Sequence, residues 1–154
     1  MPRKKSIKKA LSLALLLLML LLIWGNSALP GEESSQLSGG LTALFQRLFG
    51  PVKDLQKFTF ILRKLAHMTE FAALAIVLSW FLRQWQAKDH RPVSLPLLCG
   101  LGAACVDETI QLFSPGRGSS LRDVWIDMAG FCLGLLLYSL ISFLVSKKIS
   151  RNQK

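Results

Sequence analysis

Four long apolar segments dominate the hydropathy pattern of the chain. A helix needs about 20 apolar residues to cross a hydrocarbon core of about 30 Å, and each segment meets that length. The first segment carries no charge, and each of the other three carries its few ionisable residues close to one end. The pattern therefore predicts four membrane-spanning helices, at about residues 10–30, 58–82, 93–113 and 121–145.

The connection between the first two spans, residues 31–57, changes character along its length. It begins with the polar stretch GEESSQLSGG, which we interpret as a linker. Apolar residues then recur at helical spacing as far as Gly50-Pro51, namely Leu41, Leu44, Phe45, Leu48 and Phe49. This spacing predicts a short interfacial helix, which either packs on the bundle or lies over a site as a lid.

The first span also has features of a secretory signal peptide. Basic residues precede a dense leucine core, and the small residues of Asn26-Ser27-Ala28 follow it. An asparagine fits the small-residue rule for a cleavage site poorly. A retained helix is therefore the favoured interpretation, and cleavage is the alternative.

Composition supports a membrane protein. The chain has 154 residues, of which 51% are hydrophobic, and such a composition is too apolar for an ordinary soluble domain of this length. We therefore expect an all-α membrane protein with a four-helix bundle. A single membrane domain would cover residues 10–145, between a basic N-terminus at 1–9 and a basic tail at 146–154.

The net charge of +10 does not indicate a nucleic-acid partner. Nucleic-acid binding requires a continuous basic surface, whereas twelve basic residues here form three clusters beside the spans. Such clusters mark the cytoplasmic side and contact anionic lipids, so both termini should be cytoplasmic and membrane lipids are the expected partners. The clusters are Arg3, Lys4, Lys5, Lys8 and Lys9; Arg83, Lys88 and Arg91; and Lys147, Lys148, Arg151 and Lys154.

By this orientation, the polar residues within and beside the last three spans gather at the outer face. Ionisable side chains inside a membrane cost several kcal/mol each unless they are paired or wet, so they should face protein or a water-filled cavity. We call them the outer polar layer and treat them as candidate ligand-binding residues. They are Arg63, Lys64, His67, Glu70, Asp107, Glu108, Gln111, Arg117, Asp123 and Asp127.

Helical spacing places the members of each span on one face. Arg63, His67 and Glu70 stand at i, i+4 and i+7. Ser120, followed three residues later by Asp123, predicts a capping arrangement at the start of the fourth span. With Arg122 included, four positive charges oppose five negative ones, so interhelical ion pairs are a structural alternative to a ligand or reaction site.

Metal binding and catalysis are weakly indicated. His67 and Glu70 have the i, i+3 spacing used in bundle metal centres, but the second histidine, His90, lies in the cytoplasmic loop. We predict no metal and no cofactor, with a hard cation on the carboxylates as the alternative. A catalytic role would use His67, Glu70, Asp107 or Glu108, but no nucleophile is paired with the histidine, and the prediction leans away from an enzyme.

Small residues predict where the helices approach closely. Gly100 and Gly102 lie in the third span, and Gly130 and Gly134 lie four residues apart in the fourth. Glycine at such a spacing lets two helix backbones touch inside a membrane. We expect these positions to form the scaffold beneath the outer polar layer.

The ordered set of polar motifs resembles the VanZ-like family of bacterial membrane proteins. The resemblance rests on Arg63-Lys64 with His67 and Glu70, on Asp107-Glu108 with Gln111, on Phe113 through Pro115-Gly116-Arg117, and on Asp123 with Asp127 and Gly130, and it covers residues 58–145. It implies a bacterial cell-membrane protein in a family whose namesake is associated with low-level resistance to the glycopeptide teicoplanin. It implies no particular reaction.

The resemblance and the outer polar layer together favour a ligand of the cell envelope. The leading hypothesis is a non-enzymatic protein that binds a lipoglycopeptide such as teicoplanin, or a lipid-linked cell-wall intermediate. A membrane enzyme that acts on an envelope lipid through His67 is the second hypothesis. A structural or assembly partner, held together by ion pairs alone, is the third, and nothing in the sequence favours one oligomeric state.

Overall fold

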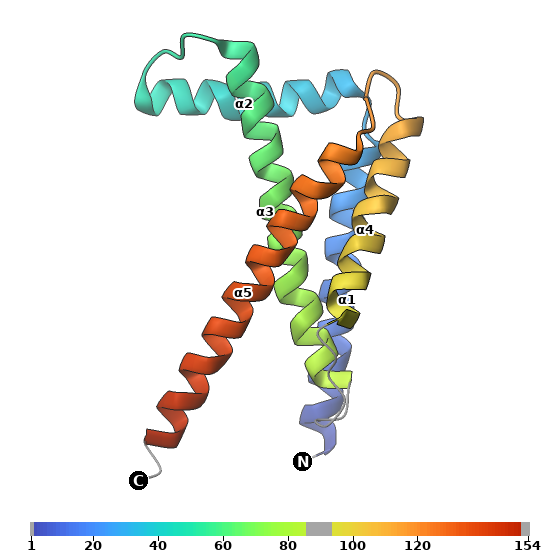
Figure 1. Ribbon diagram of the computed structural model, residues 1–154, viewed down its shortest axis with the longest axis vertical. Helices are drawn as coiled ribbons and strands as arrows, with labels where there is room; N and C mark the ends of the chain where they lie inside the picture. The colour runs from blue at the N-terminus through green and yellow to red at the C-terminus, as the bar shows by residue number, and fades with distance from the viewer. Residues whose placement is uncertain (1, 86–93, 152–154) are drawn as a thin grey trace.

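The computed structural model describes residues 2–85 and 94–151, and this part of the chain contains helices and no strand (Figure 1). The five helices in chain order are α1 (Pro2–Ala28), α2 (Gly31–Phe49), α3 (Leu55–Trp85), α4 (Ser94–Phe113) and α5 (Leu121–Arg151). All except α2 are long and apolar enough to cross a membrane, which confirms the four predicted spans. The predicted loop residues Lys88, His90 and Arg91, and Lys154 in the tail, lie outside the described residues.

The helices form an elongated bundle with α3 at its centre. Helix α3 contacts α1, α2, α4 and α5. The two ends of the chain lie at one end of the bundle, while α2 and the turn between α4 and α5 lie at the other (Figure 1). The C-terminal half of α5 diverges from the other described helices (Figure 1).

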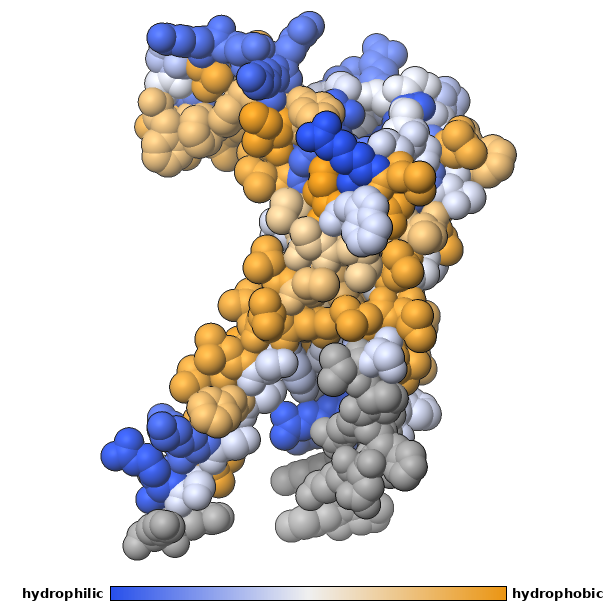
Figure 2. Space-filling view, in the orientation of Figure 1, coloured by the Kyte–Doolittle hydropathy of each residue, from blue (hydrophilic) through white to orange (hydrophobic). Residues whose placement is uncertain are grey.

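An apolar belt crosses the middle of the visible face of the molecule, with hydrophilic residues towards both ends (Figure 2). The buried core is small and contains Phe71 and Leu74 of α3, Ala104 of α4 and Phe131 of α5. Many large apolar side chains point outward instead. Leu21 and Leu136, for example, are 70% and 66% exposed. Such a surface is suited to contact with the acyl chains of membrane lipids.

Helices α3 and α5 touch through their backbones. A Cβ atom at Gly130 would collide with the carbonyl oxygen of Met68, and one at Gly134 would collide with that of Ala72. Only glycine leaves room for this approach, which confirms the close contact predicted from the spacing of the two glycines. The crossing positions Asp127, one turn before Gly130, beside α3.

The glycines of α4 differ from each other. A Cβ atom at Gly100 would meet the ring of Phe131, so this glycine belongs to the contact between α4 and α5. Gly102 is exposed and has open space around it. The sequence-based assignment of Gly102 to a helix contact is therefore wrong within the described chain, because its position on the helix turns it outward.

Helix α2 begins ten residues earlier than the apolar pattern predicts. The stretch interpreted as a polar linker is helical from Gly31, and this part of the prediction is wrong. Glu32 and Glu33 in the first turn complement the positive end of the helix dipole. The hydroxyls of Ser38 and Thr42 donate to carbonyls four residues earlier, so these buried polar side chains are satisfied inside the helix.

The two faces of α2 have different surroundings. Thr42 contacts Thr59 of α3 through their hydroxyls at 3.1 Å, and Phe45 packs on the ring of Phe58. Leu44 is exposed, as are Leu41, Leu48 and Phe49. In Figure 2, the α2 end of the molecule is blue above and tan to orange below, towards the apolar belt. Helix α2 is thus held on α3 by one side while a row of apolar side chains stays uncovered.

Candidate functional site

The structure brings all ten residues of the outer polar layer to the end of the bundle that carries α2 and the turn between α4 and α5. Helix α3 supplies four of them, α4 supplies three, the turn supplies Arg117, and α5 supplies two. Five of the ten residues are buried, and several of the ten line a pocket that opens at the surface. The layer consists of a buried cluster of carboxylates around His67 and a basic pocket beside it.

The buried part centres on the Nδ1 atom of His67. This nitrogen lies 3.9 Å from a carboxylate oxygen of each of Glu70, Asp107 and Asp127. His67, Asp107 and Asp127 are only 7%, 0% and 2% exposed. We call these four residues the His67 cluster. A separation of 3.9 Å exceeds a hydrogen bond, so none of the three carboxylates is hydrogen-bonded to this nitrogen.

Each member of the His67 cluster keeps a buried polar atom without a hydrogen-bond partner in residues 2–85 and 94–151. These atoms are His67 Nδ1, Glu70 Oε2, Asp107 Oδ1 and Asp127 Oδ2. A buried polar atom without a partner costs about 1–3 kcal/mol. Ligand atoms of His67, Asp107 and Asp127 lie within 4.8 Å of one another, so these three residues are the ones that could hold a metal ion.

Gln111 connects the His67 cluster to its surroundings. Its Nε2 atom donates to Asp107 Oδ2 at 2.8 Å and to Glu108 Oε1 at 3.2 Å, and it lies 3.5 Å from Ser27 Oγ. The first two contacts have the i, i+4 and i, i+3 spacing seen in the sequence. The third contact reaches Ser27 of α1. One amide group therefore binds two carboxylates of α4 and connects α4 to α1.

The start of α5 is capped from another helix. Ser120 Oγ accepts a hydrogen bond from the Arg122 amide at 3.1 Å, which confirms the predicted cap residue. The predicted return contact from Asp123 is wrong, because Glu108 Oε2 accepts the Ser120 amide at 2.8 Å. Asp123 pairs instead with Lys64 Nζ at 2.6 Å. Helix α4 thus fixes the start of α5, and Asp123 is free to bind α3.

A basic pocket of about 190 Å³ lies on the α3 and turn side of the layer. Arg63 Nε and Arg117 Nε and Nη1 are buried and lack a hydrogen-bond partner within the described ranges, although Arg117 Nη2 donates to Ser34 Oγ. Burial lowers the pKa of Arg117, which lies in the turn outside the spans, and the Arg63 guanidinium nearby lowers that pKa further. The pocket is lined by Phe60, Arg63, Lys64, His67, Gln111, Gly116, Arg117, Gly118 and Asp123.

Helices α1 and α2 contribute site residues that the sequence did not indicate. Asn26 Nδ2 donates to Glu70 Oε1 at 3.4 Å, and Ser114 Oγ donates to the Ser27 carbonyl at 2.9 Å. Ser34 holds the Arg117 guanidinium. The signal for them in the sequence is the polar pair Asn26-Ser27 at the end of a leucine-rich span, which is interpreted there only as part of a possible cleavage site. In the structure these residues belong to the site.

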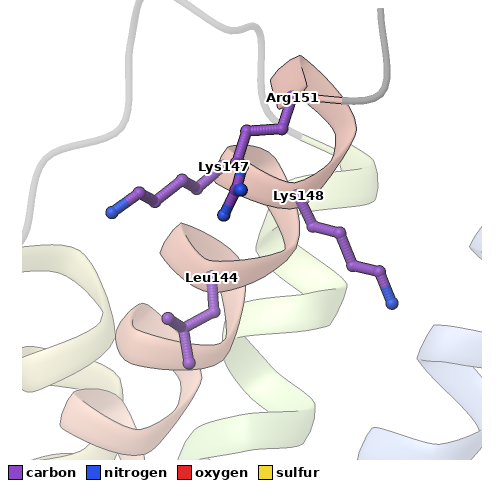
Figure 3. A pocket seen from close by; sticks show the side chains of 4 residues that line it. All are labelled: Leu144, Lys147, Lys148 and Arg151. Atoms are coloured by element: carbon purple, nitrogen blue, oxygen red, sulfur yellow. The ribbon is translucent and has the colours of Figure 1, made fainter.

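The opposite end of α5 carries a second basic region. Leu144, Lys147, Lys148 and Arg151 line an open hollow there, and the two lysines extend in different directions from the helix (Figure 3). These cations do not converge on one point as the layer residues do. Their place at the end of a span is typical of residues that contact phospholipid headgroups.

The Lys64 and Asp123 pair gives a test of interhelical ion pairing. Reversing either charge alone (Lys64→Asp or Asp123→Lys) places like charges opposite each other, and each change should lower thermal stability. The double exchange should recover about 1 kcal/mol of coupling energy in a double-mutant cycle, because both side chains are largely buried. Thermal unfolding of the purified protein in detergent measures each variant.

A pair without contact provides the comparison. Arg63 and Glu70 form no ion pair among the described residues, so Arg63→Glu and Glu70→Arg should have additive effects. Additive effects of the Lys64 and Asp123 changes would contradict the pairing seen in the structure.

Comparison with known proteins identifies the family. The sequence model of the VanZ/LLP1 family matches residues 12–142. No curated protein and no solved structure matches the chain. The match takes in α1 from residue 12, and α2, whereas the resemblance of the motifs covered only residues 58–145. Together with the four apolar helices, it shows that the chain is a multi-pass membrane protein and belongs to the VanZ/LLP1 family.

Proposed function

We propose that this family member binds an amphiphilic lipid of the bacterial cell envelope, with the anionic headgroup in the basic pocket. The observation that carries the proposal is the pair of guanidinium groups, Arg63 and Arg117, which share one pocket with unused donors. Like charges repel, and buried donors without partners destabilise the fold. An anion between the two arginines would relieve both costs.

The chemistry of the pocket favours a phosphate. Guanidinium groups present their donors in a planar fork that matches the oxygens of phosphate and carboxylate groups. Lys64 is already paired with Asp123 at the rim of the pocket. The ligand would therefore be held by the arginines, with the Gln111 amide and the turn around Gly116 shaping the rest of the pocket.

The size of the pocket narrows the choice of ligand. Its volume of about 190 Å³ is below the range of about 300–1,000 Å³ that encloses a drug-sized molecule. A phosphate headgroup of a lipid-linked cell-wall intermediate fits this space with its polyprenyl chain along the apolar belt. A lipoglycopeptide such as teicoplanin would place only one acidic group inside, so we favour the lipid-linked intermediate.

The proposed orientation puts the basic pocket at the outer face of the cytoplasmic membrane. Its support is the basic residues at the other end of the molecule, among them Lys147, Lys148 and Arg151, because such residues remain on the cytoplasmic side. Both termini would then be cytoplasmic. Helix α2 would lie in the outer interface, with its uncovered apolar side chains against lipid and Ser34 holding Arg117 over the pocket.

Retention of α1 is part of the proposal. Ile23 belongs to the buried core, and Asn26 and Ser27 contact Glu70 and Gln111. Cleavage after this segment would remove these contacts. The mature protein would therefore keep its first span as a structural part of the site.

The test is direct binding of a polyprenyl phosphate and a polyprenyl pyrophosphate to the purified protein. Arg63→Ala and Arg117→Ala should each weaken binding by about tenfold or more, since a hydrogen bond to a charged group contributes about 1.5–3 kcal/mol. Labelled lipoglycopeptide serves as the second ligand. Arg47→Ala is the matched control, because this arginine is exposed on α2 at the same end of the molecule.

Two results would contradict the proposal. The first is no measurable binding of either lipid by the intact protein. The second is an equal loss of affinity in Arg47→Ala, which would indicate general attraction between a basic surface and an anionic lipid. Tighter binding of the lipoglycopeptide than of either lipid, lost in the pocket variants, would select the antibiotic as the ligand.

A second candidate function is supported by the position of His67. This residue lines the basic pocket and also belongs to the cluster of carboxylates. A histidine between an anion site and acidic groups has the placement of a general acid or base. If the protein turns over the bound lipid, mass spectrometry of the same binding mixture will detect the product, and His67→Ala will keep binding but lose the product.

Ion pairing alone accounts for little of the layer. In the described residues, the Lys64 and Asp123 contact is the one pair between a lysine or arginine and a carboxylate within 4.0 Å. A layer that served only to join helices would pair its arginines as well. The purely structural alternative is therefore the least supported of the three hypotheses.

A further inference from the structure

We propose that His67, Asp107 and Asp127 bind one divalent metal ion, with Glu70 as a fourth ligand. The inference goes beyond the binding of an anionic lipid, because it concerns the buried cluster beside the basic pocket. The three residues come from α3, α4 and α5, so the ion would join the three helices at one point.

The distances suit a single ion. Ligands bound to one metal at about 2.0–2.2 Å lie at most about 4.4 Å from each other. The potential ligand atoms of the three residues lie within 4.8 Å, and His67 Nδ1 is 3.9 Å from an oxygen of each carboxylate. The ligand atoms therefore need to move by only a few tenths of an ångström to coordinate one ion. Rotation of the side chains is sufficient for such a shift.

The cluster contains buried polar atoms that have no hydrogen-bond partner among the described residues. His67 Nδ1, Asp107 Oδ1 and Asp127 Oδ2 are buried and unpartnered in the described part of the chain, and their residues are 7%, 0% and 2% exposed. Glu70 Oε2 is also without a partner. Buried polar atoms without hydrogen-bond partners, gathered around one histidine, match the requirement of a cation rather than that of a packing contact.

The charges of the His67 cluster also favour a bound cation. None of Glu70, Asp107 and Asp127 has a lysine or arginine nitrogen within 4.0 Å in residues 2–85 and 94–151. Three carboxylates inside a membrane domain with one histidine leave an excess of negative charge. A divalent cation supplies most of the missing positive charge at the point where the three helices meet.

A second layer of hydrogen bonds orients two of the ligands. Gln111 Nε2 holds Asp107 Oδ2 at 2.8 Å, and Asn26 Nδ2 holds Glu70 Oε1 at 3.4 Å. In both carboxylates the other oxygen is the one left without a partner. In Asp107 the oxygen that Gln111 holds is also the one 3.9 Å from His67 Nδ1. Hydrogen bonds of this kind orient the carboxylate ligands of metals in proteins.

The donor set indicates the class of metal. Carboxylate oxygens suit Mg²⁺, Ca²⁺ and Mn²⁺, whereas an imidazole nitrogen suits Zn²⁺ and other transition metals. A site with one imidazole and three carboxylates combines the ligands that suit both classes of metal. We therefore expect Mn²⁺ or Zn²⁺ to bind more tightly than Mg²⁺ or Ca²⁺.

The test is a titration of the full chain, stripped with a chelator in maltoside detergent, with Mn²⁺. Electron paramagnetic resonance of free Mn²⁺ should show one ion bound per chain, and Zn²⁺ should displace it. Asp107→Asn and Asp127→Asn should weaken binding about a hundredfold. Gln111→Leu should weaken it about tenfold, the lower end of the effect of an outer-shell partner.

The control is Glu33→Gln, which removes an exposed carboxylate of α2 that is not among the potential metal ligands and should bind Mn²⁺ as the wild type does. Thermal unfolding adds a measure for variants that fold poorly. The wild type should gain stability with Mn²⁺, and Asp127→Asn should not. Absence of Mn²⁺ and Zn²⁺ binding by the wild type, or equal losses in Glu33→Gln and Asp127→Asn, would overturn the proposal.

The titration uses no envelope lipid, so its outcome is independent of the proposed function. Metal binding without lipid binding would support the metal site and contradict the proposed anion site. Lipid binding without metal binding would support the anion site and contradict the metal site.

Discussion

Replacing Gly130 and Gly134 together by alanine is expected to lower the free energy of unfolding by about 3 kcal/mol or more. Each added methyl group would collide with a carbonyl oxygen of α3, at Met68 and Ala72. Backbone atoms cannot rotate aside as a side chain can, so α3 and α5 must move apart. Overpacking of this kind costs about 1–3 kcal/mol at each site, and here it separates the two helices with the most extensive contact.

Gly102→Ala is the matched control for this experiment. Gly102 is a glycine in the middle of α4 with open space around it, so an added methyl group meets nothing. Alanine is favoured over glycine inside a helix by about 0.5–1 kcal/mol, and the control should be neutral or slightly more stable. Thermal unfolding in detergent, with size-exclusion chromatography to confirm folding, compares the variants. Equal melting of the double variant and the control would refute the α3 and α5 crossing.

Gln111→Leu should lower the free energy of unfolding by about 2 kcal/mol, an effect second to that of the double glycine replacement. Leucine fills a similar volume but removes the amide donor from Asp107 and Glu108. Both carboxylates are buried, and a hydrogen bond to a charged group contributes about 1.5–3 kcal/mol. The loss should also free the end of α1, because the contact with Ser27 disappears.

Thr109→Val is the control for the glutamine variant. Thr109 is two residues away on the same helix, is exposed, and uses its hydroxyl only for the carbonyl of Cys105 in its own helix. Its replacement should change the unfolding free energy by no more than about 0.5 kcal/mol. Hydrogen exchange at the end of α1 reports whether that helix has loosened. A Gln111→Leu protein as stable as Thr109→Val would mean that the amide holds neither carboxylate.

The spans and the convergence of the outer polar layer could be predicted from the sequence because both follow from local rules. Apolar length alone defines a membrane helix, and the spacing of Arg63, His67 and Glu70 places them on one face. The need to keep charges away from lipid then requires the polar faces of different helices to meet. The role of the meeting point stays a proposal.

Other parts of the site depend on contacts between distant segments. The first half of α2 has too few apolar residues to predict a helix, but it is helical in the structure, where Ser34 holds Arg117 of the turn and Ser38 is buried. The spacing of Asp123 predicts a contact with the Ser120 amide. In the structure Asp123 pairs with Lys64 on α3, and Glu108 accepts the hydrogen bond from that amide. Spacing along one helix carries no information about such competition between helices.

The backbone contact between α3 and α5 has a consequence for ion size. Met68 follows His67, and Gly130 lies one turn from Asp127, so the contact lies immediately beside the proposed metal ligands. The distance across the site is then set by two touching main chains, which cannot adjust as long side chains do. Selectivity between ions of similar chemistry depends on the width and flexibility of the cavity. A site bounded in this way should accept the ionic radius of Mn²⁺ or Zn²⁺ and exclude Ca²⁺, whose larger radius would require the helices to separate.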